Sequence, residues 1–129
     1  MKFIITGRPA TKKNSSRVVR RGNFTRVLPS EAFMKYERAA VKQIKALHLP
    51  TITGPVQVEF LYWLPDRRWW PDLVGLLQAT SDILQTAGII EDDKWILCYN
   101  LSRICGLDKE NPRAIIKIWP AFDGEGAIL

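Results

Sequence analysis

The stretch PVQVEFLYWL (residues 55–64) carries the clearest strand pattern in this 129-residue chain. Four apolar side chains alternate along one side of it, namely Val56, Val58, Phe60 and Tyr62. A period of two, with β-branched and aromatic residues, is typical of a β-strand that buries one face. The sequence therefore predicts a strand over 55–64.

The residues after this strand indicate a loop and then a helix. The polar stretch DRRWWP (66–71) reads as a loop. From Asp72 onward the apolar positions follow helical spacing at Leu73, Leu76, Leu77, Thr80, Leu84 and Ala87. Gly88 is well suited to end a helix because it adopts a left-handed conformation without strain. We therefore expect a helix over 72–87.

The residues before the central strand predict a second helix, over 31–47. Ser30 is placed as its N-cap, with Glu31 in the first turn where the helix dipole favours an acid. Its apolar face comprises Phe33, Tyr36, Ala40, Ile44 and Leu47. Such spacing is typical of an amphipathic helix.

The remaining segments complete one α+β domain over residues 1–129. Strands are expected over 2–7, over roughly 89–104 with a break near the acids, and over 112–119. Residues 8–29 read as a basic, glycine-punctuated loop with a possible short strand at 23–28. The tail from 121 is expected to be frayed or engaged with a partner. The prediction is a mostly antiparallel or mixed sheet with two main helices.

Composition places the chain among soluble globular proteins. It is 47% hydrophobic and 25% charged, and its apolar runs are shorter than a membrane span. The N-terminus MKFIITG lacks the long apolar region of a signal peptide, so we expect a cytoplasmic protein without membrane association. No small-molecule cofactor is indicated.

Cysteine and histidine usage argues against several kinds of site. The only cysteines, Cys98 and Cys105, are too few for a disulfide scaffold and are expected to be reduced and buried. The only histidine, His48, is distant from both and falls at an expected helix end. A zinc site of the usual Cys/His type is nearly excluded, and His48 reads best as a helix C-cap.

Charge is spread unevenly along this chain of net charge +6. Residues 1–50 hold 12 Lys or Arg against 2 Asp or Glu, whereas residues 51–93 hold 2 against 7. A protein that only adheres to polyanions gains nothing from carboxylates, which repel phosphate unless a cation lies between them. The acidic excess of residues 51–93 therefore needs a separate explanation.

The acids bracket the second predicted helix, with Asp72 at its start and Glu91, Asp92 and Asp93 after its end. Asp72 can be explained as an N-cap, and the three later acids as a solvated turn. Geometry allows another interpretation. The helix is about 24 Å long, and six extended residues after Gly88 reach back about 20 Å. Asp93 could thus approach Asp72.

Convergent carboxylates in a basic protein suggest a site for Mg²⁺, or for Mn²⁺. Mg²⁺ takes one or two carboxylates with water and substrate phosphate, which suits hydrolysis of a phosphodiester. The basic first third would then bind the phosphates of the substrate. The candidate residues there are Lys12, Lys13, Asn14, Ser15, Arg17, Arg20, Arg21 and Arg26. A merely solvated loop is the alternative for this run.

Two tryptophans lie between cations and the first acid. Trp69 and Trp70 follow Arg67 and Arg68, which are further candidate DNA-binding residues, and directly precede Pro71. Aromatic side chains beside cations can stack on unpaired bases or wedge into a distorted duplex. A hydrophobic lid or a dimer contact is the alternative, and we favour it.

The order "PDL…L…A…D.L…AGIIEDD", after a strand ending LPDRR, resembles the RusA family of Holliday-junction endonucleases, which is common in phages and prophages. The likeness covers most of the chain and extends to "P..KKNS.R" and "PRAIIKI". It implies a small α+β homodimer, intertwined, that cuts four-way DNA junctions symmetrically with Mg²⁺. Asp72 and Asp93 would be catalytic metal ligands, with Asp92 or Glu91 as a further ligand or an orienter of water.

The sequence departs from the family motif at three polar positions. Where the family has a second Asp, an Asn and a Lys, this chain has Val74, Gly75 and Gln78. Valine cannot ligate a metal, and Gln78 can hydrogen-bond a phosphate without supplying positive charge. Two hypotheses follow: a metal-dependent junction endonuclease with a reduced site, or a relative that binds branched DNA without cutting it.

Overall fold

The computed structural model describes residues 1–12, 17–22, 24–28 and 31–122, with backbone alone for the strands Arg17–Arg21 and Phe24–Leu28. The expected Ser30 cap and most of the tail therefore lie outside the described residues. In chain order the elements are β1 (Lys2–Thr6), β2 (Arg17–Arg21), β3 (Phe24–Leu28), α1 (Glu31–Ala46), β4 (Val56–Leu64), α2 (Leu73–Thr86), the 3-10 turn η2 (Asp93–Trp95), β5 (Ile96–Cys98), β6 (Arg103–Leu107) and β7 (Arg113–Pro120).

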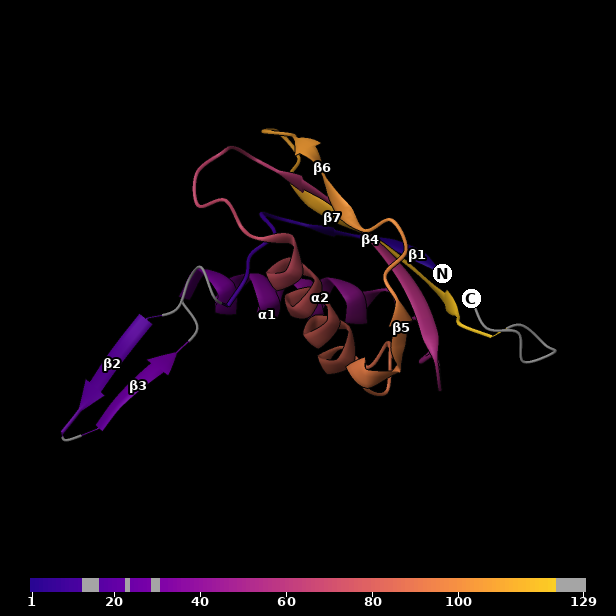
Figure 1. Ribbon diagram of the computed structural model, residues 1–129, viewed down its shortest axis with the longest axis horizontal. Coiled ribbons are helices and arrows are strands. Elements are labelled where there is room, and N and C mark those ends of the chain that lie inside the picture. The colour runs from indigo at the N-terminus through magenta and orange to yellow at the C-terminus, as the bar shows by residue number, and fades with distance from the viewer. Residues whose placement is uncertain (13–16, 23, 29–30, 123–129) are drawn as a thin grey trace.

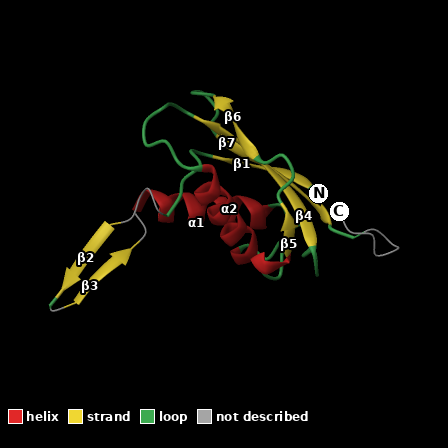
Figure 2. Cartoon of the chain, viewed as in Figure 1, coloured by secondary structure: helices red, strands yellow, loops and turns green. Residues whose placement is uncertain are grey.

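The strands form a mixed five-stranded sheet, as the sequence predicted. Its order is β1-β7-β4-β5, and β6 pairs with β4 beside β5. β7 is antiparallel to both β1 and β4, whereas β5 and β6 run parallel to β4. The parallel pairs arise because α2 carries the chain back across the sheet, as parallel strands require. Both helices lie on the same side of the sheet (Figures 1 and 2).

The core lies between this sheet face and the two helices. The alternating residues of β4, Val56 to Tyr62, are fully buried, as the pattern indicated. α1 contributes Phe33, Tyr36, Ala40 and Ile44, and α2 contributes Leu76 and Leu84 among others. Leu47 is 48% exposed, because α1 ends at Ala46 before reaching it. One α+β domain with two helices is thus confirmed for the described residues.

The basic segment before α1 is a hairpin of two strands, where we expected a loop with one short strand. β2 and β3 pair antiparallel from Arg17↔Leu28 to Arg21↔Phe24. Two residues, Gly22 and Asn23, separate the strands in the sequence, and Gly22 has φ 57°. Two-residue hairpin turns favour such positive φ values, so Gly-Asn was an available turn signal. The hairpin projects away from the sheet (Figure 1).

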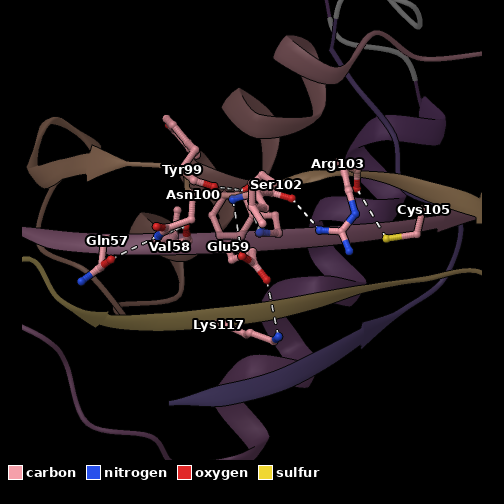
Figure 3. A network of polar contacts seen from close by, with 11 residues as sticks. Gln57, Val58, Glu59, Tyr99, Asn100, Ser102, Arg103, Cys105 and Lys117 are labelled. Carbon is pink, nitrogen blue, oxygen red and sulfur yellow. Dashed lines mark hydrogen bonds and ion pairs between the residues drawn. The ribbon is translucent and has the colours of Figure 1, made fainter. Parts of the chain in front are cut away.

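The edge of the sheet beside β4 is built from two short strands, and side-chain hydrogen bonds fix the loop between them to β4. Asn100 donates to the Gln57 side chain and the Val58 carbonyl (3.2 and 3.0 Å), and Ser102 Oγ accepts from Phe60 N (2.8 Å). Glu59 pairs with Lys117 across the sheet (3.5 Å), as Figure 3 shows. It also accepts from Leu101 N (3.4 Å). The predicted 89–104 strand is broken near the acids, as expected, because Ile90 makes only an isolated bridge and η2 follows at Asp93. It is broken a second time at 99–102, between β5 and β6.

Cysteine and histidine positions agree in part with expectation. Cys98 and Cys105 are free thiols, as predicted, but both are partly exposed because they lie on the short edge strands. His48 follows the end of α1 with φ 50°, and its N–H donates to the Lys45 carbonyl (3.2 Å). That is the capping geometry expected from the sequence. No helix in the described ranges is long and apolar enough to cross a membrane.

Candidate functional site

The outer side of α2 borders an open cavity of about 540 Å³. It is lined by Thr11, Lys12, Asp72, Val74, Gly75, Gln78, Ala79, Asp82 and Asp93. The helix residues among them follow spacings of three and four, so they form one face of α2. The segment after β1 supplies Thr11 and Lys12, and the first residue of η2 is Asp93. Asp72 and Asp93, predicted to converge, thus line one cavity.

Asp72 is the N-cap of α2, as the simpler interpretation held. Its Oδ1 accepts from Gly75 N at 2.6 Å, which satisfies one of the amides left unpaired at a helix start. Gly75 is therefore in the first turn and not in the middle of the helix. A Cβ at position 75 would press against the Asp72 carboxylate and lie 3.2 Å from Thr11 Cγ2. Gly75 leaves that carboxylate room at the cavity wall.

Asp82 is an acid of the cavity for which the sequence predicted no role. It lies two turns beyond Gly75 on the same helical face, and this spacing was the available signal. Its Oδ2 pairs with Lys12 Nζ at 3.0 Å. Both side chains are substantially exposed, so this ion pair contributes little to stability.

Asp93 lies beside Asp82 and next to Asp92. Its N–H donates to Gln85 Oε1 at 3.0 Å, which anchors the turn against the C-terminal half of α2. Partial desolvation, with the neighbouring carboxylates of Asp82 and Asp92, raises the pKa of Asp93. Close carboxylates resist joint ionisation, and a cation would relieve that repulsion. Asp93 therefore interacts electrostatically with Asp82. Asp72 lies at the other end of the cavity-lining face.

The two acids preceding Asp93 have local structural roles. Asp92 caps η2 by accepting from Lys94 N at 2.9 Å. Glu91 Oε1 accepts from Gly54 N at 2.9 Å and so holds the loop before β4. Neither residue lines the cavity in the described structure. Asp92 reaches the site through its influence on the pKa of Asp93.

Lys12 supplies a positive charge to the cavity. Besides its ion pair with Asp82, its ammonium lies 5.7 Å from the centre of the Phe33 ring. Gln78 is exposed on the same wall, where it can donate to an oxygen ligand. Lys13, Asn14 and Ser15 lie outside the described residues. Arg17, Arg20, Arg21 and Arg26 lie on the hairpin strands, where only the backbone is described.

The loop before α2 exposes the other predicted DNA contacts. Trp69 is 79% exposed with φ 54°, and Trp70 is 49% exposed, so neither is a core residue. Arg68 is paired with Asp66, whose carboxylate also accepts from Arg68 N at 2.8 Å. That backbone hydrogen bond is the main cause lowering the pKa of Asp66, with Arg8 adding to it. Arg67 makes no ion pair with another described residue.

The donor chemistry of the cavity fits a hard cation such as Mg²⁺. Carboxylate oxygens are its preferred protein ligands, and one or two of them with waters suffice. Within the described ranges no three His, Cys, Asp or Glu side chains form a ready-made metal cage. Val74, 65% exposed on the cavity wall, occupies the position where a further ligand would be expected from the family motif.

Comparison of the sequence with models of protein families and with curated proteins found no match. The likeness to RusA endonucleases therefore remains a prediction made from residues.

Proposed function

We propose that this protein is a metal-dependent endonuclease of the RusA type that acts on branched DNA, with the four-way junction as substrate. The observation that carries the proposal is that Asp72, Asp82 and Asp93 line one open cavity together with Lys12. Carboxylates beside a cation, in a chain of net charge +6, suit hydrolysis of a phosphodiester better than simple adhesion to DNA.

Each residue of the cavity has a distinct task in this proposal. Asp72 and Asp93 would hold Mg²⁺ or Mn²⁺ from opposite ends of the lining face, with Asp82 binding through water. The bound ion would activate water and neutralise charge on the scissile phosphate. Lys12 would bind a phosphate oxygen once DNA competes for its contact with Asp82, and Gln78 would donate a hydrogen bond to the same backbone.

The exposed loop at 66–70 would bind DNA next to this cavity. Trp69 presents an open aromatic surface on which an unpaired base at a branch point can stack, a contact worth about 1–3 kcal/mol per base. Arg67 is available for phosphate beside it. The basic hairpin of β2 and β3 would extend the same binding surface.

A homodimer is part of the proposal because a junction is cut at two matched positions. Two-fold symmetry would place one of two identical cavities against each of the two strands that are cut. The family resemblance implies the same arrangement. Sedimentation of the protein with and without junction DNA would measure this directly, and a monomeric complex would contradict it.

Binding without cutting is the second candidate, and Val74 is the observation that favours it. An apolar side chain, 65% exposed on the cavity wall, adds no ligand and no charge where chemistry would occur. The same DNA surface would then recognise a junction with no incision. The two candidates share their substrate and differ in turnover.

Cleavage of a synthetic four-way junction separates the candidates. The wild-type protein should cut the junction in Mg²⁺ or Mn²⁺, leave linear duplex intact, and be inactive in EDTA. Asp72→Asn, which keeps an N-cap side chain, should bind the junction but lose about 10–100-fold in rate, the loss that substitutions around a metal site commonly cause. Junction binding without cleavage in either metal would leave the binding protein as the function.

Val74→Asp tests whether this position limits the site. Adding a carboxylate should raise Mg²⁺ affinity at least about tenfold, since metal-site groups commonly contribute 10–100-fold. Isothermal titration with Mg²⁺ and the junction assay would measure the gain, with Val74→Asn as the uncharged control. Equal Mg²⁺ affinity in both variants would exclude position 74 as a ligand site.

A further inference from the structure

α1 carries a basic stripe along its outer face, defined here as Lys35, Arg38, Lys42 and Lys45. The spacings are three, four and three, which place all four side chains in one row on a helix. All four are exposed. The basic stripe lies on α1 and is separate from the hairpin predicted to bind DNA.

The basic stripe lies on the face of α1 opposite the core. The buried residues of this helix are Phe33, Tyr36, Ala40 and Ile44. At 100° per residue the two sets point in nearly opposite directions around the axis. Among the described ion pairs and side-chain hydrogen bonds, none involves a member of the stripe. Its charge is therefore available to an external anion.

Two shallow hollows follow the basic stripe. The larger, of about 410 Å³, is lined by Arg38, Lys42 and Lys45 with Glu37, Val41 and Thr86. The smaller, of about 320 Å³, is lined by Lys35 and Arg38 with Met34 and Glu31. Cations around concave surface raise the local concentration of an anionic partner. The stripe is thus an exposed, positively charged row that borders two shallow hollows.

We propose that the basic stripe of α1 binds the phosphate backbone of a DNA arm, as a second contact beyond the cavity. The inference rests on the proposed function, because it takes branched DNA as the ligand. From Lys35 to Lys45 the helix rises about 15 Å. One DNA strand carries a charge every 3.4 Å along its axis, so this length matches about four phosphates.

The chemistry of the stripe favours DNA over a membrane surface. A helix that lies on a bilayer inserts an apolar face between lipids. The apolar face of α1 is already buried against the sheet, so only its cations remain for binding. Purely ionic contact with a regular array of phosphates is what DNA offers.

The test compares two double variants that lower net charge equally. Arg38→Gln/Lys42→Gln removes the middle of the stripe, and Lys2→Gln/Lys109→Gln removes two exposed cations elsewhere. Glutamine keeps similar helix propensity, so folding should be preserved, and circular dichroism verifies it. Fluorescence anisotropy in EDTA would follow four-way junction binding across about 50–200 mM salt.

The stripe variant should lower the slope of log K against log salt by about 1.8, because each lost phosphate contact removes about 0.9. The control variant should keep the wild-type slope. Equal slopes for the two variants, with wild-type binding intact, would overturn the stripe while leaving the proposed function standing. A wild-type protein that binds no junction would refute both. Stripe-dependent binding to vesicles of phosphatidylcholine and phosphatidylserine, with junction affinity unchanged, would also overturn it.

Discussion

The two helices of this domain have similar inner faces and opposite outer faces. α1 buries Ile44 and α2 buries Leu84 against the same side of the sheet, each almost completely. Outside, α1 presents its basic stripe, whereas α2 presents Asp82 with Asp72 at its cap and contains no Lys or Arg. One helix is thus suited to phosphate and the other to a cation.

This difference shows that folding and function draw on separate residues of the same elements. Apolar burial stabilises by roughly 25 cal/mol per Å² regardless of what charge the opposite face carries. Exposed charges contribute little to stability and are therefore open to selection for binding. The polarity of the outer faces is where this domain carries its chemical specificity.

The largest expected effects are on the inner faces. Ile44→Ala and Leu84→Ala should each lower the free energy of unfolding by about 2–5 kcal/mol, because each leaves a cavity in a packed core. The matched outer-face changes Lys42→Ala and Asp82→Ala should stay within about 0.5 kcal/mol. Urea unfolding midpoints at constant slope measure all four. A cost under about 1 kcal/mol at either inner position would show that its helix is held by something other than the core.

The next effect concerns the two roles of Asp72. Asp72→Ala should destabilise the protein by about 1 kcal/mol, because it removes the cap on Gly75 N. Asp72→Asn should cost clearly less, since asparagine caps equally well. Thermal unfolding of the two variants compares them. If both lose the same stability, the charge of Asp72 matters to folding as well as to the site.

The smallest effect is a pH dependence at Asp93. Its raised pKa means that the folded state favours the protonated carboxyl, so ionisation costs stability as pH rises through the folded pKa. Asp93→Asn should therefore stabilise the metal-free protein by under about 0.5 kcal/mol at pH 7. It should give no stabilisation at a pH below 3.8, the ordinary pKa of an aspartate.

Urea unfolding at the two pH values would measure this difference, and added salt should shrink it because the carboxylates are exposed. A stabilisation that persists at low pH would assign the effect to shape rather than to charge.

Local patterns were sufficient for most of the framework. The alternation in β4, the apolar stripes of α1 and α2, and the stop at Gly88 (φ 79°) all appear in the structure close to their expected bounds. Each pattern reflects which side chains of one element are buried, and buried side chains recur with the period of that helix or strand. The basic hairpin was not predicted because its polar, basic composition indicated a loop, and this was given more weight than the Gly22-Asn23 turn signal.

Which residues line the cavity was decided by the tertiary structure. The sequence brought Asp72 and Asp93 into consideration, but the direction taken after Gly88 put Asp93 against Asp82 and Gln85, and turned Glu91 toward Gly54. Those outcomes follow from hydrogen bonds between segments far apart in the chain, which no local period encodes. Helical spacing could place Asp82 on a face, but only the packed fold decided that Lys12 meets it there.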